Sequence, residues 1–163
     1  MSRDILFKTD EFVFSYRVAG ILIRDGMVLL QTTPDDPGYA FPGGHVSFGE
    51  TNEETLIREF EEEISARIKV NNLRWVEEAF FPWGSKPCHQ ICLYYDVELV
   101  GTPEIPLSGS FDSYDEMDNT KINLIFSWVP LSEMPNITLY PANTVELLQD
   151  EPGNIAHFVY RQK

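Results

Sequence analysis

Three glutamates near the middle of the chain are spaced so that one helix would present them together. Glu59, Glu62 and Glu63 are separated by three and four residues, which places them within an arc of about 100° on a helix. Like charges at i,i+4, as at Glu59 and Glu63, destabilise an isolated helix by about 0.2–0.5 kcal/mol. A hard divalent cation, which binds carboxylate oxygens, would offset this repulsion. The pattern therefore indicates a metal-binding face, and the alternative is a solvated acidic face.

The helix that would carry these glutamates has a clear start and a separate packing face. Thr51 and Glu54 form a capping box, which predicts a helix start near Asn52. A second arc, centred roughly 120° from the acidic one, is apolar. It consists of Leu56, Ile57, Phe60 and Ile64.

Arg58 lies within the acidic face of the predicted helix. It follows Glu54 by four residues and precedes Glu62 by four, so it can brace the glutamates by charged hydrogen bonds without projecting into the metal site. The alternative is a surface ion pair of little energetic value.

A glycine pair precedes the helix. Gly43 and Gly44 permit backbone conformations closed to other residues and allow a main-chain carbonyl to approach a ligand closely. Residues 32–44 contain Pro34, Pro37 and Pro42, which predicts a turn-rich loop leading to the glycines.

These residues together resemble the Nudix box, the signature of the MutT-like Nudix hydrolases. In this signature, five residues separate Gly44 from Glu50, and seven separate Glu50 from the run Arg58, Glu59 and Phe60. One further residue separates Phe60 from the pair Glu62 and Glu63. Three positions depart from the signature: Phe60 replaces an aliphatic residue, Ser65 replaces a glycine, and Ala66 is a weak hydrophobe. None of them removes a ligand. Ser65 in a left-handed helix end costs about 1 kcal/mol, which favours a different end to the helix.

The resemblance implies a metal-dependent pyrophosphohydrolase that uses Mg²⁺ or Mn²⁺. Its substrate would be a nucleoside diphosphate linked to another moiety, cleaved by water attack at phosphorus. By motif position, the implied metal ligands are the Gly43 carbonyl, Glu59, Glu62 and Glu63, while Glu50 orients the site. The same glutamates, with Arg58 and Glu50, are the implied catalytic residues.

The implied fold is a single Nudix domain over residues 1–163, of the α/β class. It would be an α/β/α sandwich with a mixed central sheet, which agrees with strands interleaved with helices along the chain. Strands are predicted over 12–23, 27–32, 72–81, 88–100 and 122–129, an edge strand over 155–160, and a short helix over 142–149. Residues 82–87 and 101–119 are predicted loops.

The general base is left open between Glu59 or one of its partners and an acid from the later loop, as in other members of the family. The loop candidates are Asp112, Asp115, Glu116 and Asp118. A glutamate that precedes the strand tryptophan in some members is replaced by Ser127. The alternative for the four acids is a solvated loop.

Substrate-binding residues are predicted on the strands. Arg17 could hold a phosphate or a base, and Phe81 and Trp83 could stack on a base beside Lys86 and His89. The alternatives are an edge ion pair for Arg17, core positions for the two aromatic residues, and a hydrogen-bonded strand residue for His89.

Composition limits the partners. Twenty-six acidic against 12 basic residues give a formal net charge of −14, which disfavours duplex nucleic acid and anionic membranes. No apolar run approaches a membrane span and no long apolar leader is present, so a cytoplasmic location is expected. Cys88 and Cys92 are predicted to be buried thiols on one strand face.

Alternative functions remain at this point. A catalytically inactive, Nudix-like nucleotide sensor would result if Ser65 or Phe60 misaligned the helix. An acidic calcium-binding or interaction module lacks an Asp-x-Asp-x-Asp-Gly loop, and an isomerase of the same fold has no support in the sequence. An aromatic edge near Phe80 and Phe81 could pair two chains as a homodimer.

Overall fold

The computed structural model describes residues 2–117, 120–151 and 153–163, without the side chains of residues 116 and 117. The strands are β1 (Leu6–Lys8), β2 (Val13–Arg24), β3 (Met27–Thr33), β4 (Asp36–Ala40), β5 (Gly43–His45), β6 (Ile68–Trp83), β7 (Lys86–Leu99), β8 (Ser110–Met117), β9 (Thr120–Pro130) and β10 (Ala156–Arg161). The helices are α1 (Asn52–Ile64), a 3₁₀ helix η1 (Leu131–Asn136) and α2 (Thr144–Leu147).

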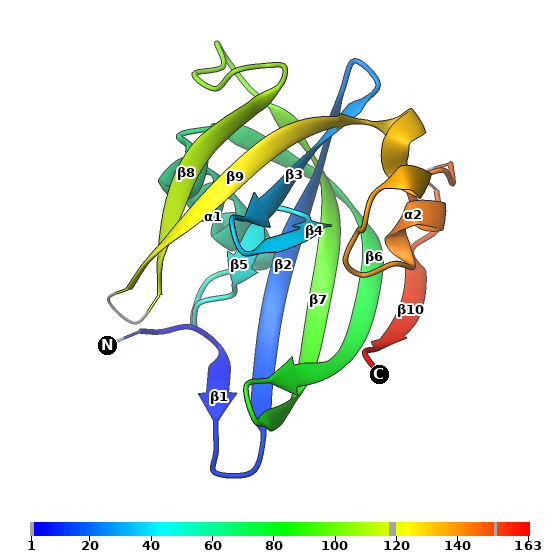
Figure 1. Ribbon diagram of the computed structural model, residues 1–163. Helices are drawn as coiled ribbons and strands as arrows, with labels where there is room; N and C mark the ends of the chain where they lie inside the picture. Colours follow the sequence, from blue (N-terminus) through cyan, green and yellow to red (C-terminus); the bar gives the residue numbers. More distant parts are fainter. Residues whose placement is uncertain (1, 118–119, 152) are drawn as a thin grey trace.

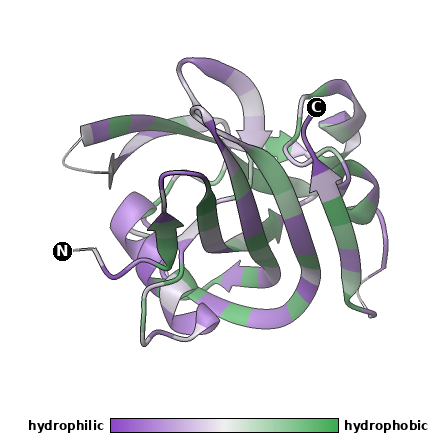
Figure 2. Cartoon of the chain, turned by 90° about the horizontal axis from the view of Figure 1, so that it is seen from below, coloured by the Kyte–Doolittle hydropathy of each residue, from purple (hydrophilic) through white to green (hydrophobic). Residues whose placement is uncertain are grey.

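The strands form one mixed sheet with the order β10-β6-β7-β2-β3-β9-β8 (Figure 1). β1 and β5 pair with β2, and β4 pairs with β3. The β10–β6 and β2–β7 pairs are parallel, and the other pairs are antiparallel. Hydrophilic and hydrophobic residues alternate along the long curved strands, as expected when successive side chains point to opposite faces (Figure 2).

Two hydrophobic cores lie on opposite faces of the sheet. On one face, Val18 and Leu22 of β2 pack with Leu56 and Phe60 of α1. On the other face, the alternate β2 residues Ala19 and Ile21 belong to a core that also contains Met134 of η1 and Leu148 at the end of α2. Helices thus cover both faces, which confirms the predicted α/β/α sandwich.

β2 and β3 separate soon after their hairpin. They pair only through Ile23 with Val28 and Arg24 with Met27. Farther along, β2 pairs with β5, as in Arg17 opposite His45, while β3 pairs with β9 and β4. The sheet therefore opens between β2 and β3, and this opening faces α1 and β5.

The predicted start of α1 is confirmed. Thr51 Oγ1 accepts the Glu54 N–H at 3.1 Å, and the Glu54 carboxylate accepts the Thr51 N–H at 2.9 Å. Ser65 ends the helix in the left-handed conformation, with φ of 54°, and its N–H donates to the Glu61 carbonyl. A glycine would adopt this conformation without strain, so the helix ends as in the signature but at a cost in energy.

Several predicted elements differ in the structure. Ile57 is 36% exposed rather than packed, and Thr55 is buried in its place. The predicted loop over 32–44 contains the short strands β4 and β5, and the predicted loop over 82–87 is mostly the β6–β7 hairpin. The second half of the predicted loop over 101–119 forms β8, because it pairs with β9 along its length.

The aromatic edge proposed for a homodimer is not an edge. β10 pairs with β6 from Trp75 to Phe80, so backbone groups there are already bonded. Phe80 stacks against His89 and the Arg161 guanidinium. No helix among residues 2–117, 120–151 and 153–163 is long and apolar enough to span a membrane.

We expect Phe60→Ala to lower the free energy of unfolding by about 3–5 kcal/mol, because Phe60 is 1% exposed and its ring lies against Gly20. Ile57→Ala, on the same helix, should cost about 1 kcal/mol or less because the side chain is partly exposed. Urea denaturation measures both values. Equal losses in the two variants would contradict this packing.

Candidate active site

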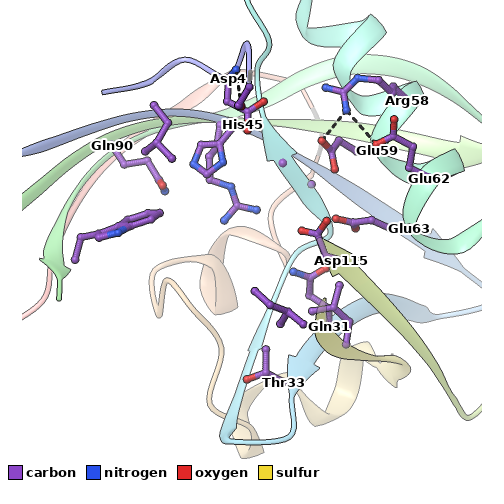
Figure 3. A pocket seen from close by; sticks show the side chains of 18 of the residues that line it. Asp4, Gln31, Thr33, His45, Arg58, Glu59, Glu62, Glu63, Gln90 and Asp115 are labelled. Atoms are coloured by element: carbon purple, nitrogen blue, oxygen red, sulfur yellow. Dashed lines mark hydrogen bonds and ion pairs between the residues drawn. The ribbon is translucent and has the colours of Figure 1, made fainter. Parts of the chain in front are cut away.

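A cavity of about 760 Å³ lies where β2 and β3 separate. α1 contributes Glu59, Glu62 and Glu63 to its wall, and β5 contributes Gly43 and Gly44. The predicted acidic face of α1 therefore borders a cavity, and Glu62 lies at its exposed side. Figure 3 shows the three glutamates on one side of this cavity and His45 with Gln90 across from them.

Arg58 connects the acidic residues of the site. Its Nε lies 3.0 Å from Glu50 Oε1. Its Nη1 lies 2.9 Å from Glu59 Oε1 and 3.2 Å from Glu62 Oε2 (Figure 3). Nη2 donates to Ser47 Oγ at 3.2 Å. These contacts fasten the loop before α1 onto the helix and orient the Glu50, Glu59 and Glu62 carboxylates.

The position of Arg58 differs from the prediction in two ways. Its side chain lines the cavity and lies between proposed metal ligands instead of staying outside the site. Glu54, which was expected to pair with it, caps the helix instead through the Thr51 N–H. Burial opposes the charge of Arg58, but the hydrogen bond to Glu50 and the charge of Glu59 raise its pKa, so it remains a cation.

Glu59, Glu63 and Asp115 form an electrostatically unfavourable group. Burial, together with the charges of Glu59 and Asp115, raises the pKa of Glu63 to about 9. Burial also raises the pKa of Glu59, although Arg58 opposes this effect. Asp115 and Glu63 lie beside each other in Figure 3. A cation in the cavity would relieve both the desolvation and the repulsion.

The glycine pair allows α1 to approach the sheet closely. A Cβ atom at Gly44 would lie 2.4 Å from Glu59 Cδ, and one at Gly43 would lie 2.0 Å from the Val18 carbonyl oxygen. Any other residue at Gly44 would therefore displace the Glu59 carboxylate. The glycines are required by this close approach, with β5 paired to β2, and not by a loop conformation.

β8 contributes one of the predicted acids. Asp115 faces the cavity, whereas Asp112 is exposed on the other face of the strand. Glu116 lies on β8, and Asp118 lies outside the described residues. The strand is held near α1 because Ser113 Oγ donates to the Glu63 carbonyl.

Three of the four predicted substrate-binding residues line the cavity: Arg17, Phe81 and Trp83. The structure does not bring Lys86 there, because its ammonium donates to the Thr9 carbonyl at 2.6 Å. His89 lies on the opposite face of β7, packed against Phe80 with ring centroids 4.4 Å apart.

The sequence interpretation missed His45 and Gln90, which also line the cavity. His45 Nε2 lies 3.0 Å from Ser15 Oγ, which donates to Gln90 Oε1 at 3.0 Å. Burial, with the nearby Arg17 charge, lowers the pKa of His45 to about 4, so the ring is neutral near pH 7. Strand alternation was a usable signal, because Gln90 falls between the buried thiols Cys88 and Cys92 on one face.

Residues 15–150 match the NUDIX domain family. The chain belongs to this family. An ADP-ribose pyrophosphatase of Methanocaldococcus jannaschii is 33% identical over 87 residues, covering 52% of this chain and 50% of the relative. A putative 8-oxo-dGTP diphosphatase of Bacillus subtilis is 40% identical over 63 residues, covering 39% of this chain and 40% of the relative. The matches thus span half or less of these curated relatives.

Solved Nudix structures share the fold. The crystal structure of an ADP-ribose pyrophosphatase from Streptococcus suis aligns with a TM-score of 0.59 and 12% sequence identity. The alignment covers 88% of this chain and 98% of that one. Because the identity is low, this likeness shows only that the sheet and its covering helices are arranged alike.

Nudix hydrolases generally use divalent metal ions, and the donors in this cavity fit such an ion. They are carboxylates beside a backbone that approaches closely, the oxygen ligands that hard cations prefer. Among the described residues, no group of three His, Cys, Asp or Glu side chains is arranged closely enough to hold a metal ion. Arg58, which bonds to Glu59 and Glu62, is the cation that balances them.

A second cavity of about 310 Å³ adjoins the first in this Nudix domain. Arg17, Phe81 and Gln90 line both. Glu77, which is 3% exposed, lines only the second cavity, and its Oε1 accepts a hydrogen bond from the Tyr94 hydroxyl at 2.9 Å. Burial raises the pKa of Glu77 to about 7, although Tyr94 and Arg17 oppose the shift.

Glu77 should make stability depend on pH. Its pKa of about 7 in the folded state exceeds the ordinary value of 4.5, so the folded state binds more protons between these two values. The free energy of unfolding should therefore fall as pH rises from 4.5 to 7, by at most about 1.4 kcal/mol per pH unit from this group. Glu77→Gln, which stays neutral, should gain stability relative to the wild type over this range.

Denaturation at several pH values measures this difference. Glu98→Gln, at an exposed position of β7, is the control and should follow the wild-type profile. Parallel profiles for Glu77→Gln and the wild type would show that Glu77 is not protonated by burial.

Proposed function

We propose that this Nudix domain is a metal-dependent pyrophosphohydrolase that cleaves a nucleoside diphosphate linked to another moiety. The observation that carries the proposal is the half-buried acidic group of Glu59, Glu63 and Asp115 facing one cavity beside Arg58. Such a group is costly unless a cation and an anionic substrate complete it.

The proposed metal ligands are Glu59, Glu62, Glu63 and the Gly43 carbonyl, all of which border the cavity. The chemistry that bound Mg²⁺ or Mn²⁺ supplies is neutralisation of the diphosphate and activation of a water molecule. Arg58 and Glu50 hold the glutamates in orientation through the hydrogen bonds described above.

The other residues bind the substrate and move the proton. Asp115 lies beside Glu63 and is the proposed general base that takes a proton from the attacking water. Arg17 would bind a phosphate, because its buried Nε has no hydrogen-bond partner among the described residues. Phe81 and Trp83 would contact the organic part of the substrate. Lys86 is not part of this proposal, since it is bonded elsewhere.

The relatives narrow the substrates worth testing. One is named an ADP-ribose pyrophosphatase and another a putative 8-oxo-dGTP diphosphatase, both of which act on nucleotide derivatives. These two compounds, nucleotide sugars, dinucleoside polyphosphates and capped RNA ends form a panel to be screened with Mg²⁺ and Mn²⁺. Identification of the products by chromatography gives the bond that is cleaved.

On any substrate the panel identifies, Glu62→Gln and Glu63→Gln should each lower kcat/KM by at least about 100-fold, because each removes a charged metal ligand. Glu61→Gln is the matched control, since Glu61 is exposed on the same helix and does not line this cavity. Full activity in both site variants would refute the metal assignment. Stabilisation by a nucleotide in a thermal-shift assay without product would instead support a nucleotide sensor.

Asp115→Asn tests the general base. We expect kcat to fall by about 10²–10⁴-fold, because the attacking water would lose its proton acceptor. Asp112→Asn, on the exposed face of the same strand, should leave kcat unchanged. If Asp115→Asn also keeps the wild-type kcat, a glutamate of α1 is the base instead.

A further inference from the structure

The second cavity contains a buried carboxylate whose hydrogen bonds are incomplete. Glu77 Oε1 accepts from Tyr94, but Oε2 has no hydrogen-bond partner among the described residues. Glu77, Cys92, Arg17 and His45 occupy one row across the strands β6, β7, β2 and β5. An unpaired oxygen of an otherwise buried carboxylate, facing a cavity, is an acceptor available to a ligand.

Gln90 presents hydrogen-bond donors to the same cavity. The single hydroxyl hydrogen of Ser15 goes to Gln90 Oε1, so His45 Nε2 must be the donor to Ser15 Oγ. This chain of hydrogen bonds occupies the amide oxygen of Gln90. Its amide nitrogen makes no hydrogen bond within the described structure, so the side chain presents N–H donors to the cavity.

The donor and the acceptor are close enough to bind one planar group. Gln90 pairs with Ala79, and Glu77 pairs with Cys92, so Glu77 and Gln90 are diagonal neighbours on adjacent strands. Their Cβ atoms are therefore about 7 Å apart, within reach of two long side chains. Aromatic side chains of Phe81, Tyr140 and Tyr160 also line the cavity and can pack against a flat ring.

We propose that the second cavity binds the nucleobase of the substrate and that Glu77 and Gln90 select guanine. This inference rests on the proposed function, since it assumes a nucleotide whose phosphates occupy the first cavity. Guanine presents one acceptor, O6, beside two donors, N1–H and the N2 amino group. Gln90 supplies one donor, and Glu77 supplies its free Oε2 and the lone pair of Oε1 that Tyr94 leaves unused, so every position is matched. Adenine presents a single exocyclic amino donor beside one acceptor, so it could pair with Gln90 and one oxygen of Glu77 but would leave the other carboxylate oxygen without a donor.

Arg17 connects base recognition to phosphate binding. It lines both cavities, and it stands in the same cross-strand row as Glu77. A nucleotide with its base against Glu77 and Gln90 would thus carry its phosphates past Arg17 toward the glutamates of α1.

Binding of nucleoside monophosphates without turnover tests the inference. The wild type in EDTA at pH 8, above the pKa of Glu77, is titrated with GMP, IMP and AMP by isothermal calorimetry. We expect GMP to bind at least about tenfold more tightly than IMP, which lacks the N2 amino group, and than AMP. Glu77→Gln should abolish the preference of GMP over IMP, whereas Gln90→Met should weaken both by similar factors.

Glu78→Gln is the matched control. Glu78 follows Glu77 on β6, bonds to His157 outside both cavities, and should leave the GMP preference unchanged. Equal affinities for GMP and AMP, tighter binding of AMP, or identical effects of the Glu77 and Glu78 variants would each overturn the inference. The binding experiment is independent of the hydrolysis assays on the substrate panel. Selective binding of GMP by a protein that hydrolyses none of the panel would refute only the proposed function. Hydrolysis by a protein that binds GMP and AMP equally would refute only this inference.

Discussion

The site depends on half-buried carboxylates whose mutual repulsion a cation must offset. Glu59 and Glu63 share a helix face, and Asp115 reaches them from β8. Arg58 offsets part of this charge, and through Glu50 it also fixes the loop that enters the helix. Without a bound ligand, the repulsion among these carboxylates lowers the stability of the fold. Such unfavourable groups of charges are typical of sites that bind a charged ligand.

The sheet provides the room for that site by separating. β2 leaves β3 after the hairpin and pairs with β5, whose glycines bring α1 close. The resulting opening joins two cavities around Arg17. Groups suited to phosphate chemistry come from α1 and β8, whereas groups suited to recognition come from alternate positions of the long strands. The two sets of groups therefore come largely from different elements, and Arg17 of β2 is the residue that borders both cavities.

Sequence reasoning was strongest where the signal was local. The helix start at Asn52 and the common face of the three glutamates follow from residue types within a few positions, whereas the left-handed end at Ser65 runs against the preference of its residue type. Reasoning failed where distant pairing decided the outcome. β8 forms from a polar segment because β9 supplies its hydrogen bonds, and Lys86 turns away because the Thr9 carbonyl lies nearby.

The sequence by itself determined the family, the helix and the acidic face, because periodicity and capping act over one or two turns. Only the tertiary structure decided that Asp115, and not Asp112, faces Glu63. It also decided that Glu77 and Gln90 share a cavity. Those juxtapositions depend on strand register, since a shift of one residue would turn each side chain to the other face. Register is set by pairing between segments far apart in the chain, and no local pattern encodes it.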